Sequence, residues 1–152
     1  MRQLEVRRHA KRDPLADALS AEGRAQAQAV GAAHATAYDA VFVSPAQRAA
    51  ETVAWFLRGG GQQLPPDHEV VPGLAGRGAD GGSPEDMASG LRALLDRVPE
   101  GGRGLAVSHT PLVERGAFGL TGEEIEPLRE CEGILLTIGD DGTLTLAELR
   151  LA

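Results

Sequence analysis

The stretch VFVSPAQRAAET, residues 41–52, decides the fold class of this chain. Its three apolar residues predict a short buried strand over residues 40–43, and Ser44-Pro45 predicts an N-cap followed by proline at the first helical position. We expect that helix to run to about Leu57, where three glycines at 59–61 end it. A strand that passes directly into a helix is the repeating unit of a parallel α/β sheet.

The same alternation of strand and helix patterns recurs along the chain. The last two strands flank Asp140-Asp141-Gly142, which predicts a hairpin. The chain is therefore expected to form a three-layer α/β/α fold with a mainly parallel sheet and an antiparallel edge strand. The remaining expected strands are Leu4–Val6, Glu69–Val71, Leu105–Val107, Ile134–Ile138 and Thr143–Leu149, and the remaining helices run from Ser20 to about Thr36, from a capping box at Ser83–Asp86 to about Val98, and from Thr110-Pro111 onward.

The first strand departs from this pattern. A central parallel strand is expected to be apolar on both faces, yet RQLEVR, residues 2–7, alternates between polar and apolar residues. Glu5 and Arg7 project from the same face of such a strand. We therefore expect these two side chains to pair.

Composition narrows the class of protein. A length of 152 residues fits one domain, and with 42% hydrophobic but 3% aromatic residues its core is mainly Ala, Val and Leu. A net charge of −7 argues against nucleic acid as a partner. No apolar run reaches the length of a membrane span or signal peptide. The single cysteine, Cys131, excludes an internal disulfide framework, so a cytoplasmic location is expected.

Polar clusters follow three of the expected strands: Arg8-His9, Ser44-Pro45 with Arg48, and Ser108-His109. Ligands of open α/β sheets bind outside the carboxyl ends of the strands. The clusters are therefore expected to converge, although they are about a hundred residues apart in sequence. Taken singly, each has an ordinary structural explanation, such as a surface pair or a helix cap. Together, they suit a phosphoryl group, because an imidazole can act as the nucleophile and guanidinium groups can donate paired hydrogen bonds to the phosphoryl oxygens.

Four stretches also resemble the histidine phosphatase superfamily, whose fold is named after cofactor-dependent phosphoglycerate mutase. Arg8-His9-Ala10 is similar to the Arg-His-Gly tripeptide of that family, and VSPAQRAAET, residues 43–52, is similar to its second motif. LSAEGRAQA, residues 19–27, and AVSHTP, residues 106–111, match in the same order. The short chain resembles the compact phosphohistidine phosphatase branch.

The resemblance implies a role for each of these residues. His9 would be the nucleophile, Arg8 and Arg48 would bind the phosphoryl oxygens, and His109 would stabilise the transferring group from the other side. Ser44 is a further candidate phosphate ligand. Two arginines and an imidazolium can supply the charge that phosphoryl transfer needs, so neither a metal nor a cofactor is expected.

The sequence departs from the family at the general acid. Many members carry a glutamate after the third strand, whereas Asp80 is the only carboxylate between residues 72 and 82. Asp80 is therefore the candidate acid, while Glu85 and Asp86 have a competing explanation in helix capping. Arg77 is a candidate substrate contact, although a solvated loop arginine explains it equally well. Ala10, in place of the glycine, is expected to crowd the phosphate loop slightly.

These observations predict a metal-independent phosphatase that works through a phosphohistidine intermediate. Its expected partner is a phosphorylated protein or a small phosphorylated metabolite, not a nucleic acid or a membrane. Three alternatives stay open: a phosphoglycerate mutase-type phosphotransferase, a non-catalytic phospho-ligand binding module on the same fold, and a flavodoxin-like domain. The chain lacks two features that a flavodoxin-like domain would need, the Gly-rich phosphate turn after the first strand and the acidic cluster for magnesium.

Overall fold

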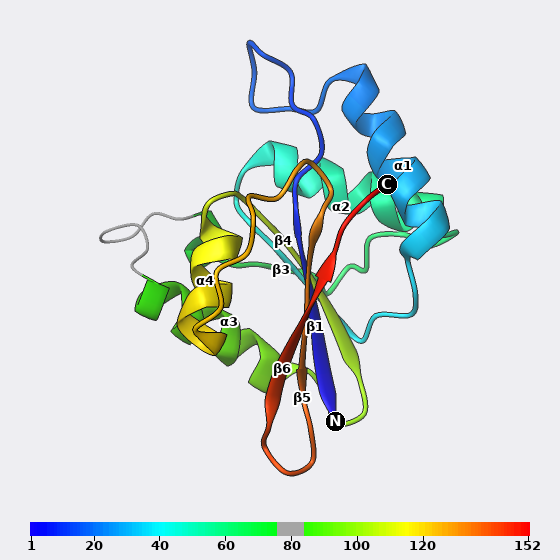
Figure 1. The fold of residues 1–152 in the computed structure, drawn as a ribbon. Coiled ribbons are helices and arrows are strands. Elements are labelled where there is room, and N and C mark those ends of the chain that lie inside the picture. Colours follow the sequence, from blue (N-terminus) through cyan, green and yellow to red (C-terminus); the bar gives the residue numbers. More distant parts are fainter. Residues whose placement is uncertain (76–83) are drawn as a thin grey trace.

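A computed structural model of the chain describes residues 1–75 and 84–152. Within these residues six strands form one sheet in the order β3-β2-β4-β1-β5-β6 (Figure 1). The strands are β1 (Arg2–Arg8), β2 (Ala40–Val43), β3 (Glu69–Val70), β4 (Arg103–Ser108), β5 (Gly133–Ile138) and β6 (Leu144–Leu149). The helices are α1 (Ala21–His34), α2 (Gln47–Gly59), α3 (Pro84–Arg97) and α4 (Leu112–Thr121), with a 3₁₀ turn at Pro72–Ala75.

The directions of the strands confirm the mainly parallel sheet. β1, β2, β3 and β4 are mutually parallel, whereas β5 runs antiparallel to β1 and forms the predicted hairpin with β6. The register pairs Arg8 with Ser108 and Val43 with Val107. The carboxyl ends of β1, β2 and β4 therefore lie at one edge of the sheet.

Two helix pairs cover the two faces of the sheet, which confirms the three layers (Figure 1). α1 and α2 pack over Leu105 and Val107, while α3 and α4 pack over Ala106 on the opposite face. The alternation of β4 between the two cores follows from the two-residue period of a strand. None of the described helices has the length and apolarity needed to cross a membrane.

A glycine allows α1 and α2 to pack closely. A Cβ atom at Gly31 of α1 would lie 1.8 Å from the carbonyl oxygen of Phe56 in α2. Any side chain at this position would separate the two helices. Because α2 carries Arg48, this packing also fixes where that arginine enters the site.

The predicted helix caps are confirmed in one case and wrong in two. The Ser20 hydroxyl accepts a hydrogen bond from the Gly23 N–H at 3.0 Å and caps α1 as expected. Ser44 does not cap α2, which begins three residues later at Gln47. Its hydroxyl instead lies 2.7 Å from a ring nitrogen of His109.

Thr110 likewise does not cap α4, which begins at Leu112. Its hydroxyl donates instead to the Glu114 carboxylate. The Ser44 hydroxyl is thus engaged by a side chain distant in sequence, and the Thr110 hydroxyl by a side chain in the first turn of α4. Ser83 lies outside the described residues.

The Glu5–Arg7 pair in β1 is confirmed. Glu5 is fully buried, and its carboxylate accepts hydrogen bonds from Arg7 Nε at 2.5 Å, Arg103 Nη2 at 2.7 Å and the Tyr38 hydroxyl at 2.8 Å. Arg7 also donates to the Cys131 carbonyl at 2.7 Å. Burial, followed by the Glu5 charge, raises the pKa of Tyr38. The polar alternation of β1 therefore reflects a buried ionic network, whose charges are paired as burial requires.

Candidate active site

Three of the predicted residues follow directly after parallel strands and meet at the carboxyl edge of the sheet. His9 comes after β1, Ser44 after β2 and His109 after β4. Backbone hydrogen bonds extend the sheet into this edge: the His9 N–H donates to Ser108 O at 3.1 Å and the Ser44 N–H donates to Val107 O at 3.2 Å. The backbone at His9 and Ser44 therefore continues the sheet, and the two histidines are buried, with exposures of 7% and 6%.

One guanidinium joins the two imidazoles. Arg48, in the first turn of α2, lies with Nε 3.3 Å from His9 Nε2 and with Nη2 3.3 Å from His109 Nδ1. The two ring centroids are 5.3 Å apart, with the rings tilted by 59°. Residues from three distant segments thus form one cluster, as the sequence predicted.

The contacts of His9 assign its tautomer. Because a guanidinium only donates, His9 Nε2 accepts from Arg48, and the proton resides on Nδ1. That nitrogen donates to the Ala10 carbonyl at 2.7 Å. Burial, assisted by the Arg48 and Arg8 charges, lowers the pKa of His9. At neutral pH His9 therefore carries a lone pair on Nε2, as an attacking nitrogen requires.

His109 has the opposite tautomer. Its Nδ1 accepts from Arg48, so its Nε2–H donates to Ser44 Oγ at 2.7 Å. Burial, followed by the Arg48 charge, lowers the pKa of His109 to about 4. His109 is thus neutral at pH 7 without an anion beside it. A phosphate dianion placed against the ring would favour the cation.

Arg8 lies at the edge of the cluster and is held by a segment that the sequence did not connect with the site. Its Nη1 donates to the Leu128 carbonyl at 2.7 Å, and its Nη2 lies 3.6 Å from a carboxylate oxygen of Glu130. Its Nε is buried and has no hydrogen-bond partner in the described part of the chain. Buried N–H groups are rarely left unpaired, and this donor suits an anionic ligand.

Thr52 ties the turn after His9 to α2. Its hydroxyl accepts a hydrogen bond from the Ala10 N–H at 2.9 Å and donates to the Arg48 carbonyl at 2.7 Å. Ala10 is fully buried in the apolar cluster beneath α1 and α2. The methyl group that replaces the family's glycine is therefore packed into the core.

Asp17 is a residue of the site that sequence reasoning missed. Its carboxylate accepts from Arg48 Nη1 at 2.8 Å and from the backbone N–H groups of Gln47 and Arg48 at 3.0 and 3.2 Å. It thus takes the place at the start of α2 that was predicted for Ser44. Although burial acts to raise it, these hydrogen bonds hold the pKa of Asp17 below its ordinary value. Nothing in the local sequence signals a partner 31 residues away.

The structure describes two of the candidate acids, Glu85 and Asp86, but not the third. Asp80 and Arg77 lie outside the described residues. Glu85 and Asp86 are exposed in the first turn of α3, and the capping interpretation also needs Ser83, which lies outside the described residues. Within residues 1–75 and 84–152, no group of three or more His, Cys, Asp or Glu side chains could hold a metal ion.

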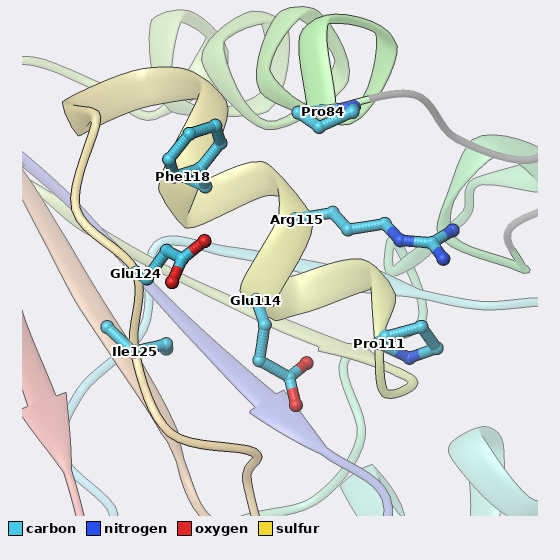
Figure 2. A pocket seen from close by; sticks show the side chains of 7 residues that line it. All are labelled: Pro84, Pro111, Glu114, Arg115, Phe118, Glu124 and Ile125. Carbon is cyan, nitrogen blue, oxygen red and sulfur yellow. The ribbon is translucent and has the colours of Figure 1, made fainter.

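A cavity of about 340 Å³ lies along α4 and reaches Pro111, two residues after His109 (Figure 2). Figure 2 shows Phe118 and Arg115 on the helix, with Glu124 and Ile125 on the segment that follows it. The Glu114 side chain also lines the cavity, together with Pro84. This cavity was not predicted from the sequence.

Comparison with known proteins agrees with the sequence motifs. The family model of the histidine phosphatase superfamily (branch 1) matches residues 6–77, which include His9 and Arg48. No curated protein matches the chain in sequence.

Solved structures share the fold. The protein histidine phosphatase SixA, complexed with tungstate, has a TM-score of 0.75 at 24% identity, covering 97% of this chain and 96% of that one. A mutant phosphoserine phosphatase from Entamoeba histolytica, complexed with phosphoserine, has a TM-score of 0.75 at 16% identity, with coverages of 98% and 97%. A phosphoglycerate mutase from Bacillus anthracis has a TM-score of 0.73 at 15% identity, with coverages of 96% and 91%. The chain thus matches the histidine phosphatase superfamily (branch 1) over residues 6–77 and has the phosphoglycerate mutase-like fold along nearly its whole length.

Proposed function

We propose that the chain is a metal-independent phosphatase, formed by one histidine phosphatase-like domain, that works through a phosphohistidine on His9. The observation that carries this proposal is the contact of one guanidinium with two imidazoles, which leaves the His9 lone pair on Nε2. The structural neighbours include a protein histidine phosphatase and a phosphoserine phosphatase, which supports phosphate-ester or phosphoramidate substrates.

The reaction divides into two displacements at phosphorus. In the first, His9 Nε2 forms a bond to phosphorus while the bond to the leaving group breaks, and the leaving group departs with the electron pair. In the second, water attacks the phosphohistidine, the P–N bond breaks, and inorganic phosphate leaves with the neutral imidazole restored. Both steps need alignment and charge stabilisation more than covalent assistance.

The two arginines and His109 would supply that stabilisation. On phosphate binding, the Arg48 donors that now face the imidazoles turn toward phosphoryl oxygens, while Nη1 stays on Asp17. The unpaired Arg8 Nε–H gives a further donor. His109, neutral in the free site, gains a proton as the dianion approaches, so that its charge appears where negative charge accumulates.

The leaving group decides the preferred substrate. Asp17 is a poor general acid, because its carboxylate is engaged by Arg48 and its pKa is lowered. Asp80 remains the candidate acid. Without a strong acid, an alkoxide leaves slowly, whereas imidazole and phenolate leave more easily. We therefore propose phosphohistidine proteins as the preferred substrates, ahead of small alkyl phosphomonoesters.

A substrate panel tests the proposal. It contains a phosphohistidine peptide, an aryl phosphate, phosphoserine and a sugar phosphate, each assayed with and without a chelator. The expected result is chelator-insensitive hydrolysis, fastest for phosphohistidine and the aryl phosphate, and abolished by His9→Ala. Phosphate binding without any hydrolysis would instead support a phospho-ligand binding module.

A further inference from the structure

Glu114, in the first turn of α4, joins two segments that meet at the proposed phosphate site. Its Oε2 accepts hydrogen bonds from the Thr110 hydroxyl and from the Leu128 N–H, the latter at 2.9 Å. These partners precede and follow α4 in sequence, so one carboxylate oxygen connects the entry to the helix with the segment beyond its end.

The contact with Leu128 leads to Arg8. Leu128 is 2% exposed, and its carbonyl accepts the hydrogen bond from Arg8 Nη1 at 2.7 Å. Leu128 thus accepts a hydrogen bond from Arg8 through its carbonyl and donates one to Glu114 through its N–H. A shift of this backbone would move the guanidinium.

The contact with Thr110 leads to His109. The two residues are adjacent, and the His109 carbonyl accepts from the Val113 N–H at 3.1 Å at the start of α4. The bond between the Thr110 hydroxyl and Glu114 therefore fixes the turn that carries the imidazole onto the helix. One carboxylate thus supports both sides of the phosphate site.

The second carboxylate oxygen of Glu114 is not explained by helix stability. Glu114 Oε1 is buried and has no hydrogen-bond partner within the described residues. A buried unpaired carboxylate oxygen lowers the stability of the fold. A carboxylate at this position therefore costs stability, and its two accepted hydrogen bonds point to a geometric role.

We propose that Glu114 is a positioning residue that holds Arg8 and His109 in the relative positions needed to bind one phosphoryl group. This inference rests on the proposed function and extends it to a residue outside the His/Arg cluster. Glu114 acts through Leu128 and Thr110 and does not touch the substrate. Displacing reacting groups by a fraction of a bond length can cost on the order of 100-fold in rate.

Two variants and a matched control test this role. Glu114→Ala removes the acceptor, Glu114→Gln keeps one side-chain oxygen that can accept both bonds, and Glu124→Ala removes an exposed carboxylate on the same cavity wall. The measurements are kcat and KM with an aryl phosphate, inhibition by vanadate and the melting temperature. We expect Glu114→Ala to lower kcat/KM by about 10- to 100-fold and to weaken vanadate inhibition in parallel. Glu114→Gln should retain most of both, and Glu124→Ala should match the wild type.

Two outcomes would overturn the proposal. One is a folded Glu114→Ala variant with the same kcat/KM and vanadate inhibition as Glu124→Ala. The other is a Glu114→Gln variant as impaired as Glu114→Ala, because the amide oxygen preserves both acceptor bonds. If the alanine variant does not fold, Thr110→Val removes one donor and should still lower kcat/KM, and an unchanged value would count against the role.

The inference can fail separately from the proposed function. A wild-type protein that hydrolyses no phosphate compound contradicts the phosphatase. Calorimetric binding of vanadate to the same variants still reports on Glu114, since the anion contacts Arg8 and His109 without turnover. Equal vanadate affinity in wild type and Glu114→Ala would overturn the positioning role alone.

Discussion

Replacing Arg48 with lysine should separate charge from geometry in the proposed phosphate site. The guanidinium uses three nitrogens on three partners: Nε on His9, Nη2 on His109 and Nη1 on Asp17. A lysine ammonium keeps the charge but cannot reproduce a planar fork. When phosphate binds, Arg48→Lys should therefore lose about one charge-assisted hydrogen bond.

The size of the effect follows from that count. A hydrogen bond to a charged group contributes about 1.5–3 kcal/mol, which corresponds to roughly 10- to 150-fold in kcat/KM. Arg48→Ala removes the charge and the two donors, Nε and Nη2, that turn toward the phosphate. The resulting loss of kcat/KM should exceed the roughly 100- to 1,000-fold found for one oxyanion donor. The Asp17 side chain is 47% exposed, so losing its partner should change the free energy of unfolding by less than about 1 kcal/mol.

Steady-state hydrolysis of an aryl phosphate measures the rate effect, and urea denaturation measures stability. Gln47→Ala, in the neighbouring position of α2, serves as the control for changes at the helix start. The reasoning is refuted if Arg48→Lys retains kcat/KM to within about threefold of wild type. It is equally refuted if the loss of activity follows a loss of folded protein.

Further predictions concern pH, stability and the leaving group. Because the pKa of His9 is lowered, ¹⁵N NMR of the free protein should show a neutral His9 ring with its proton on Nδ1 between about pH 8 and about pH 6.5, and a ring already half protonated above pH 7 would contradict the assigned tautomer. The pKa of His109 falls from 6.5 to about 4 on folding, so its contribution of about 3 kcal/mol to the free energy of unfolding is complete above pH 6.5 and is lost as pH falls toward 4. His109→Asn should remove this part of the acid dependence in urea titrations, and an unchanged dependence would argue against a buried neutral ring. Arg7→Met should lower the free energy of unfolding by about 2–4 kcal/mol by leaving Glu5 without its strand partner, with recovery in the double variant with Glu5→Gln, and a neutral single variant would show that the buried network is dispensable. Rates across a series of phosphate esters should fall steeply as the leaving-group pKa rises, and Asp80→Asn should slow alkyl esters more than phosphohistidine; a flat series would reveal an effective acid elsewhere.

The features predicted correctly from sequence are those that depend on periodicity and chain direction. Apolar runs that pass into helices, as at residues 41–52, indicate parallel strands. Their carboxyl ends must then share one edge of the sheet. In the structure Arg8 lies opposite Ser108 in the paired strands, as that rule requires. The pairing brings His9 and His109 together although they are a hundred residues apart in sequence. The polar alternation of β1 also had a local explanation, the Glu5–Arg7 pair.

Two of the missed features depend on partners distant in sequence, and one depends on a choice between two local partners. Ser44 and Thr110 each carry the local signature of a helix cap, but their hydroxyls are engaged by His109 and Glu114. Asp17 lies in a loop, and only the folded chain shows that it caps α2. Capping preferences reflect only the backbone nearest to a side chain. The contacts of Ser44 and Asp17 depend instead on how separate loops meet at the carboxyl edge of the sheet.

Trapping the phosphoenzyme tests the central claim most directly. Turnover of a ³²P-labelled aryl phosphate or phosphohistidine peptide is stopped within milliseconds, and the protein is analysed for acid-labile, base-stable phosphate. The account predicts label on wild-type protein at His9, its absence in His9→Ala, and retention in Glu124→Ala. Wild-type labelling in His9→Ala, or label located on another residue during normal turnover, would contradict the account.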